Sequence, residues 1–136
     1  MNQNKIALDS CVVIDIIEKP KVASKLKASL RGKSVKIILC DTVLSEVYRV
    51  RGYATSFVIF KISKILERKI ELSKMEDGAK AIALSEQFAI CHNGDNKILS
   101  LCQAKDFVLV TFDRMLLKTC QFVGVAAFHP FMAGGI

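Results

Sequence analysis

Three aspartates follow short apolar segments of the sequence. Asp9 comes directly after KIAL, Asp41 directly after VKIILC, and Asp113 shortly after FVLV. Such segments are typical of buried strands, because they are apolar, rich in β-branched residues and too short to form helices alone. In an open parallel sheet the carboxyl ends of the strands share one edge, where ligands bind. We therefore expect these aspartates to lie near one edge of a sheet.

Two further acids are expected at the same edge. Glu46 lies in the second turn of the helix predicted after VKIILC, and Asp95 lies at the start of the predicted helix DNKILSLCQA. Carboxylates held close together repel each other and raise each other's pKa unless a cation neutralises them. Carboxylate oxygens suit Mg²⁺ or Mn²⁺, and the chain has no His or Cys spacing typical of zinc sites. The pattern predicts a divalent metal site.

Each acid also has a simpler explanation as a local structural residue. The residues alone leave both the structural and the metal-binding explanation open. Asp9 and Asp95 have the position of helix N-caps, which stabilise a helix by about 1 kcal/mol. Asp113 has the position of a turn aspartate after a strand. Glu46 has the position of a surface residue near a helix start, and we interpret Asp41 as a helix cap. It is the joint pattern that favours a functional site.

Strands and helices alternate along the predicted chain. The predicted strands are Lys5–Leu8, Val35–Cys40, Phe107–Val110 and a last one within FVGVAAF, with Lys69–Leu72 either a strand or an extended connector. The predicted helices are CVVIDIIE up to Pro20, Lys21–Leu30, TVLSEVYRV closed by Gly52, Ala54–Arg68, Met75–Phe88, DNKILSLCQA after a turn at Cys91–Gly94, and Met115–Lys118. Apolar strands separated by helices predict a parallel sheet covered on both faces. The expected fold is α/β, a three-layer sandwich with a central parallel sheet flanked by helices, in one domain spanning residues 1–136.

The formal net charge of +7 is unevenly distributed. Residues 1–80 contain 16 Lys and Arg against 9 Asp and Glu, whereas residues 81–136 contain 4 of each kind. The segment KPKVASKLKASLRGKSVK carries seven basic residues and no acid. Such a segment attracts polyanions such as nucleic acid, although a solvated helix face has the same pattern.

Other phosphate chemistries lack their motifs in this chain. There is no GxxxxGK[ST] loop and no GxGxxG after the first strand. A DxD phosphatase motif is absent because Asp9 is followed by Ser10 and Cys11, and there is no acidic pair of the response-regulator type. His92 and His129 are too isolated to indicate a catalytic triad. An acidic pocket in a basic protein remains, and this combination is typical of a metal-dependent nuclease.

Four segments in order, ALDSCVVID, LSEVYR, GDNKILSLC and VLVTFDRML, resemble the PIN-domain family and, within it, the toxin ribonucleases of VapBC toxin–antitoxin modules. The resemblance covers essentially the whole chain. It implies a quartet of catalytic and metal-binding acids at Asp9, Glu46, Asp95 and Asp113. It also implies that this site binds Mg²⁺ or Mn²⁺ and hydrolyses RNA phosphodiester bonds with metal-activated water.

The resemblance further implies supporting roles for three polar residues. Thr111 and Ser10 are expected to hold the site by hydrogen bonding, and Asn96 offers an amide oxygen where many relatives have a more acidic cluster. The implied partners are an RNA substrate, a cognate antitoxin and a second copy in a homodimer. The helix with Phe57, Ile59, Phe60 and Ile62 offers a contact surface, with core packing as the alternative use. The tail HPFMAGGI matches nothing in the family pattern.

Two other functions agree with the same residues. A PIN nuclease of RNA maturation or decay would need no antitoxin, and a non-catalytic PIN-like module would only bind RNA. The complete quartet argues against the second of these, because a degenerate member would be expected to have lost an acid. A small antitoxin gene beside this one would separate the toxin from the processing nuclease.

Cysteine usage and hydropathy predict the compartment. The five cysteines are odd in number and contain no CxxC pair, which favours a reducing environment without structural disulfides. The first residues, MNQNKIALDS, have no apolar signal-peptide core, and no stretch reaches the roughly 20 apolar residues of a membrane span. We expect a cytoplasmic protein without membrane association.

Overall fold

Parallel strands form the centre of the computed structural model, which describes residues 4–74 and 93–131, with the backbone alone for residues 93–96. The strands are β1 (Lys5–Leu8), β2 (Lys36–Cys40), β3 (Ile70–Ser73), β4 (Val108–Val110) and β5 (Ala127–Phe128). They lie in the order β3-β2-β1-β4-β5, and all neighbours are parallel. The inner strands β1, β2 and β4 consist almost entirely of buried apolar residues, as strands covered on both faces require.

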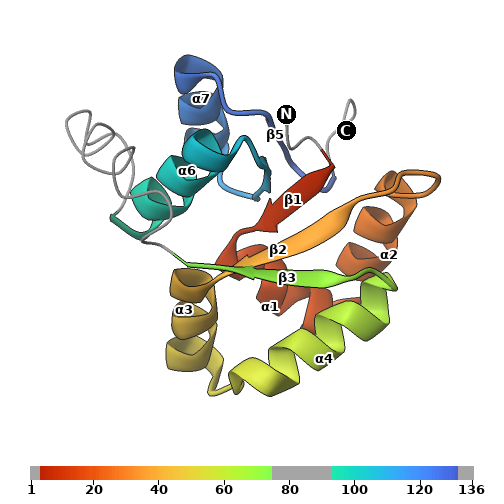
Figure 1. Cartoon of the computed structure of the whole chain (residues 1–136). Coiled ribbons are helices and arrows are strands. Elements are labelled where there is room, and N and C mark those ends of the chain that lie inside the picture. The colour runs from red at the N-terminus through yellow and green to blue at the C-terminus, as the bar shows by residue number, and fades with distance from the viewer. Residues whose placement is uncertain (1–3, 75–92, 132–136) are drawn as a thin grey trace.

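Four helices cover one face of this sheet (Figure 1). They are α1 (Ser10–Glu18), α2 (Pro20–Ser29), α3 (Asp41–Arg51) and α4 (Thr55–Leu66), and α1 contacts each of the other three. The chain steps from β1 to β2 and then to β3 in one direction across the sheet. Because parallel crossovers are right-handed, both crossovers place their helices on the same face.

Two described helices lie on the opposite face (Figure 1). These are α6 (Asn93–Lys105) and α7 (Arg114–Val123), which precede and follow β4. From β4 to β5 the chain steps in the other direction, so the right-handed crossover puts α7 on the other side of the sheet. The predicted three-layer α/β sandwich is confirmed. No described helix has the length and apolar character needed to cross a bilayer.

The strand order creates a switch point between β1 and β4. The chain leaves β1 toward one edge of the sheet and leaves β4 toward the other. At such a point the two following helices diverge onto opposite faces and leave a crevice beyond the strand ends. Asp9 directly follows β1, and Asp113 ends the short connection from β4 to α7, so the topology brings both to the switch point.

Several predicted boundaries agree with the structure because local signals set them. Pro20 stands at the first turn of α2, where its missing N–H costs no hydrogen bond. Gly52 ends α3 at φ 72°, and Gly124 ends α7 at φ 79°; both are left-handed conformations that glycine adopts without a Cβ clash. The segment Lys69–Leu72 is resolved as strand β3, Ile70–Ser73.

Other predicted boundaries are wrong. Helix α7 continues to Val123 rather than ending at Lys118, because Leu116, Thr119 and Cys120 form one buried stripe that runs until Gly124. Phe122 and Val123 are therefore helical, and the last strand within FVGVAAF is only Ala127–Phe128.

Two helix starts also differ from the prediction. Cys40 is the N-cap residue of α3, and Asp41 is its first helical residue, which accepts a 2.8 Å hydrogen bond from the Thr42 N–H. Helix α6 already begins at Asn93, so the second half of the predicted turn Cys91–Gly94 is helical. The first half of that turn and the predicted helix Met75–Phe88 lie outside the described residues.

Three cysteines are part of the core. Cys40, Cys102 and Cys120 are buried thiols, whereas Cys11 is exposed. Burial raises the pKa of the Cys102 thiol well above its usual value, and the neighbouring Cys120, Cys40 and Asp9 add to this effect. Cys102 is therefore protonated at neutral pH and acts as a small apolar residue beneath the crevice.

Candidate active site

Asp9 lies directly after β1, at the switch point, with only 8% of its surface exposed. Its backbone N–H donates to the Val110 carbonyl at 3.1 Å, which fixes its position beside the end of β4. Its Oδ1 accepts a hydrogen bond from the Ser10 N–H at 2.8 Å, and its Oδ2 accepts one from the Thr111 hydroxyl at 2.8 Å. The carboxylate therefore caps α1 and is held in one orientation by two elements.

Burial raises the pKa of Asp9 above its usual value. The hydrogen bonds from Thr111 and Ser10 lower the pKa and so oppose this effect, whereas the charges of Glu46 and Asp113 raise it further. These two acids are thus close enough to Asp9 for their negative charges to destabilise its ionised form. None of the three acids forms an ion pair with a Lys or Arg in the described part of the chain.

Glu46 enters the site from α3 through a contact with Ser10. The Ser10 hydroxyl donates a 3.0 Å hydrogen bond to Glu46 Oε1, and Ser10 itself is buried. Ser10 therefore bridges two acids: its N–H binds Asp9 and its hydroxyl binds Glu46. The helix that follows β2 delivers Glu46 to the site that the strand ends form.

Thr111 connects Asp9 with Asp113. It is fully buried, and its hydroxyl accepts a 3.1 Å hydrogen bond from the Asp113 N–H while donating to Asp9. Asp113 Oδ1 accepts from the N–H groups of Met115 at 2.9 Å and Leu116 at 3.2 Å, so Asp113 is the N-cap of α7. Its second carboxylate oxygen accepts no hydrogen bond from the described residues and is left for another partner.

Asp95 and Asn96 lie in the first turn of α6, but their side chains are outside the described part of the structure. Their predicted roles therefore stay predictions. Among the side chains that are described, no group of three His, Cys, Asp or Glu residues lies close enough to hold a metal ion. The described acids Asp9, Glu46 and Asp113 converge around Ser10 and Thr111 without forming a complete ligand set on their own.

The chemistry of these donors fits a hard divalent cation. Asp9, Glu46 and Asp113 supply only carboxylate oxygens, which Mg²⁺ and Mn²⁺ prefer. Burial is the main cause of the raised pKa of Asp9, and the charges of Glu46 and Asp113 add to it; a dication would neutralise this concentration of negative charge. The simpler explanation for Asp9 holds geometrically, because Asp9 caps α1; Asp113, expected as a turn aspartate, is instead the N-cap of α7. Capping and metal binding are compatible, since capping uses one oxygen of each carboxylate.

The PIN-domain family model matches residues 6–121, most of the chain and every element that positions the crevice. The chain belongs to the PIN-domain family. Proteins of this family are nucleases, which supports a hydrolase activity for this PIN domain. No curated protein matches the sequence significantly.

Solved structures share the fold of this PIN domain. The crystal structure of VapBC2 from Rickettsia felis, bound to a promoter DNA fragment, matches with a TM-score of 0.67 at 18% identity. The match covers 92% of this chain and 98% of that chain. FitAcB from Neisseria gonorrhoeae has a TM-score of 0.62 at 17% identity, with 93% of this chain and 98% of that chain covered. VapBC-1 from nontypeable Haemophilus influenzae has a TM-score of 0.61 at 15% identity, with 94% and 99% covered. At these identities the likeness concerns the fold.

One feature of this PIN domain, beside the end of β4, was not predicted from the sequence. Phe112, between Thr111 and Asp113, contacts the rings of His129 and Phe131. His129 had been considered only for a catalytic triad, and the tail had no assigned role. The pattern HPF shortly after a strand was the available signal, but nothing in the sequence places it against Phe112.

Replacement of Ser10 by alanine should weaken the site without unfolding the PIN domain. The substitution removes the hydroxyl that holds Glu46 but keeps the N–H that binds Asp9. Residues that orient metal ligands typically contribute 10–100-fold to metal affinity or activity. We expect about a tenfold higher Mg²⁺ concentration at half-maximal cleavage, measured by metal titration. Ser29→Ala, which removes an exposed hydroxyl bonded to the Lys25 carbonyl, is the control and should change nothing.

Proposed function

We propose that this PIN domain is a Mg²⁺- or Mn²⁺-dependent endoribonuclease that hydrolyses RNA phosphodiester bonds. The observation that carries the proposal is the Asp9–Thr111–Asp113 network at the switch point, with Glu46 joined to it through Ser10. Three acids are held there without basic partners in the described chain. The excess of Lys and Arg elsewhere suits a polyanionic substrate.

Asp9, Glu46, Asp95 and Asp113 would hold the metal. When bound, the ion would lower the pKa of water and offset negative charge on the phosphate. Thr111 orients Asp9 by donating to Oδ2 and lowers the pKa of this carboxyl against the effect of burial, and the Ser10 hydroxyl orients Glu46 by donating to Oε1. The N-cap bonds of Asp113 fix its carboxylate relative to α7, so its second oxygen is held at a defined position. Asn96 is proposed to support the site from the first turn of α6.

The proposed biological role is that of a toxin with a cognate antitoxin. The structural neighbours described above include two VapBC structures and FitAcB, and this supports a comparable partner for this chain. A homodimer in the cytoplasm is part of the same proposal. Co-expression with a small protein encoded beside this chain, followed by purification through a tag on one partner, tests for the complex.

Helix α4 offers a candidate surface for that partner. Phe57 is 39% exposed and Phe60 is 59% exposed, whereas Ile62 is fully buried and belongs to the core. Ile59 is half-buried and lines a shallow groove of about 590 Å³ with Phe60 and Lys64. Exposure therefore divides the two alternative uses: Ile62 packs in the core, whereas Phe57 and Phe60 are available to a contact surface.

The test of the nuclease proposal is cleavage of total RNA by purified protein in Mg²⁺, Mn²⁺ or EDTA. We expect cleavage in either metal and none in EDTA, with activity restored when excess Mg²⁺ is added back. Cleavage that persists unchanged in EDTA would contradict the metal proposal. Binding of RNA without cleavage in any metal would support the non-catalytic RNA-binding alternative instead.

A further inference from the structure

Three aromatic rings form a cluster beside the crevice. The Phe112 and Phe131 rings are stacked with centroids 6.1 Å apart. The His129 and Phe112 rings are T-shaped, with centroids 5.2 Å apart and an interplanar angle of 69°. The Phe131 N–H donates a 3.0 Å hydrogen bond to His129 Nδ1, which ties the chain around Phe131 to the His129 ring. Burial and the charge of Arg114 lower the pKa of His129, so the imidazole is neutral at pH 7 and Nδ1 stays an acceptor.

The cluster lines two adjoining hollows, which together we call the aromatic groove. The first has a volume of about 740 Å³ and is lined by residues from the end of α1, the start of α2 and all three rings. The second, of about 580 Å³, is lined by α2 and Phe131. Pro20, Lys21 and Phe131 belong to both. Each volume lies within the range of about 300–1,000 Å³ of small-ligand sites.

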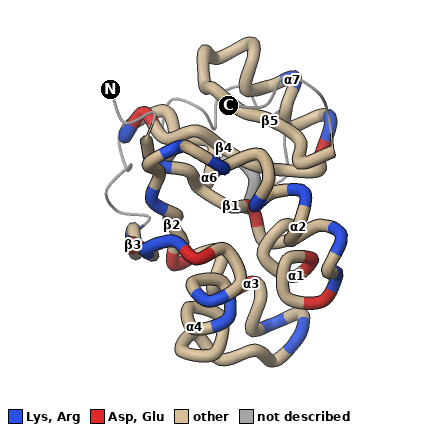
Figure 2. Tube along the Cα trace, turned by 90° about the vertical axis from the view of Figure 1, so that its right-hand side faces the viewer, with Lys and Arg blue, Asp and Glu red and all other residues tan. Residues whose placement is uncertain are grey.

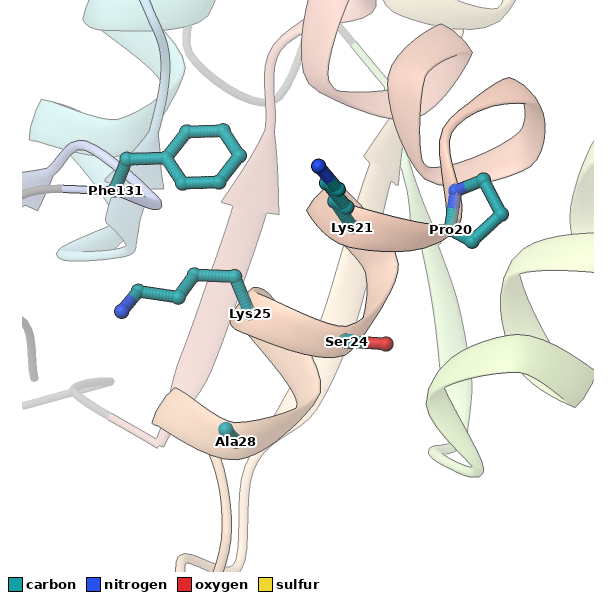
Figure 3. Close-up of a pocket in the computed structure, with 6 residues that line it drawn as sticks. All are labelled: Pro20, Lys21, Ser24, Lys25, Ala28 and Phe131. Carbon is teal, nitrogen blue, oxygen red and sulfur yellow. The ribbon is translucent and has the colours of Figure 1, made fainter.

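One wall of the aromatic groove is cationic. Figure 3 shows Lys21 and Lys25 of α2 across from the Phe131 ring, and both residues line the second hollow. Helix α2 contains no acidic residue, and basic residues follow one another along it (Figure 2). Neither Lys21 nor Lys25 forms an ion pair with any described residue. Their charges are therefore available to an anion.

The acids of the first hollow are already engaged. Glu18 accepts hydrogen bonds from Arg51 Nε at 2.9 Å and the Tyr53 hydroxyl at 2.6 Å. Asp15 lies 3.5 Å from the Lys19 ammonium. The positive charges of Lys19 and Arg51 offset these carboxylates, so the unpaired charge in the groove is that of Lys21 and Lys25.

The groove is close to the candidate active site. It begins at Phe112, which stands between Thr111 and Asp113, and continues along α1, which starts after Asp9 and spans about 13 Å over its nine residues. An RNA strand whose phosphate lies at the acids therefore reaches the groove with a neighbouring nucleotide. Exposed aromatic rings beside basic side chains are the combination that binds unpaired bases and the backbone of single strands.

We propose that the aromatic groove is a substrate subsite that binds a nucleotide of single-stranded RNA flanking the cleaved bond. The base stacks on Phe131, and the adjoining phosphates contact Lys21 and Lys25. This inference rests on the proposed ribonuclease function but concerns binding, and binding is measurable without cleavage. Because stacking accepts every base, the subsite contributes affinity for unpaired RNA rather than sequence selectivity.

Fluorescence anisotropy with a labelled, randomised 12-nucleotide RNA in EDTA tests the subsite. Phe131→Leu keeps an apolar side chain but removes the stacking ring, and we expect about a tenfold weaker Kd. The double variant Lys21→Gln/Lys25→Gln should flatten the dependence of log K on log salt concentration by about 1.4, because each lost phosphate contact to a single strand contributes about 0.7. All three positions are exposed, so the variants are expected to fold normally.

Helix α4 supplies matched controls. Phe60→Leu removes a ring that is 59% exposed, compared with 49% for Phe131, and Lys61→Gln/Lys64→Gln removes two lysines that lie over Phe57 and Phe60. These variants should keep the parental Kd and salt slope. Equal losses of RNA affinity in the α4 variants and the groove variants would overturn the subsite. No loss of RNA affinity in the groove variants would overturn it as well.

Cleavage assays on the same proteins separate the subsite from the proposed function. RNA binding that weakens in the groove variants, in a protein that cleaves no RNA, would support the subsite and refute the nuclease. Normal RNA cleavage and binding by every groove variant would refute the subsite and leave the nuclease intact. Failure of the parental protein to bind the RNA, or loss of only a protein partner in the groove variants, would also overturn the subsite.

Discussion

Asp9→Asn should abolish RNA cleavage. Asp9 is the most buried of the described acids, and both its oxygens are oriented by Ser10 and Thr111. The substitution removes a negative charge where the metal is proposed to bind, and metal ions contribute several kcal/mol to transition-state stabilisation. Since each 1.36 kcal/mol corresponds to a factor of ten in rate, we expect a loss of at least about 10³-fold. Initial rates on total RNA in saturating Mg²⁺ measure it.

The same substitution should not destabilise the metal-free fold at neutral pH. The raised pKa of Asp9 means that the folded state binds a proton more tightly than the unfolded state. Ionised Asp9 therefore destabilises the fold once the pH rises above the folded-state pKa, and this destabilisation disappears as the pH falls toward the ordinary value of 3.8. The Asp9→Asn substitution removes this destabilising charge. Any gain in the free energy of unfolding should therefore be larger at pH 7 than at pH 4, as measured by urea titrations in EDTA.

Asp41→Asn is the matched control for Asp9→Asn. Asp41 also begins a helix directly after a parallel strand, and it accepts a similar hydrogen bond from the following N–H, but it is exposed. We expect parental activity in this variant. If Asp9→Asn retained activity within tenfold of the parent, or if both variants lost activity equally, Asp9 would not be the centre of the site.

Thr111→Val should reduce both activity and stability. Valine has the shape of threonine but lacks the hydroxyl, so Asp9 Oδ2 loses its donor and the Asp113 N–H loses its acceptor. An unsatisfied buried polar group costs about 1–3 kcal/mol, and we expect a loss of that size in the free energy of unfolding. Activity should fall about 10–100-fold, because the orientation of both acids depends on this hydroxyl. Urea unfolding and cleavage rates measure the two effects.

Two comparison variants separate positioning from packing. Thr111→Ser keeps the hydroxyl and loses a buried methyl group, so we expect activity to be largely restored although some stability is lost. Thr119→Val removes another buried hydroxyl, which binds only the Met115 carbonyl within α7, and should leave cleavage unchanged. Parental activity in Thr111→Val would show that the hydroxyl does not orient the acids.

Local sequence signals were sufficient for most elements of the fold. The apolar strands β1, β2 and β4, the end of α1 before Pro20 and the end of α3 at Gly52 were predicted correctly, because their causes lie within a few residues. Helix α7 was predicted too short, because its length depends on a stripe that packs on the sheet and on the left-handed Gly124. Asp41 was predicted as a cap although Cys40 has that position, a one-residue difference that the sequence does not resolve.

The sequence by itself determined which side chains stand at strand ends, since apolar runs and the acids that follow them are local features. The tertiary structure decided which of these acids meet. The order β3-β2-β1-β4-β5 makes β1 and β4 neighbours although about 100 residues separate them, so Thr111 reaches Asp9. The aromatic groove likewise depends on β5 lying beside β4, which brings His129 to Phe112. Contacts between distant segments follow from strand order and helix packing, and no local pattern encodes them.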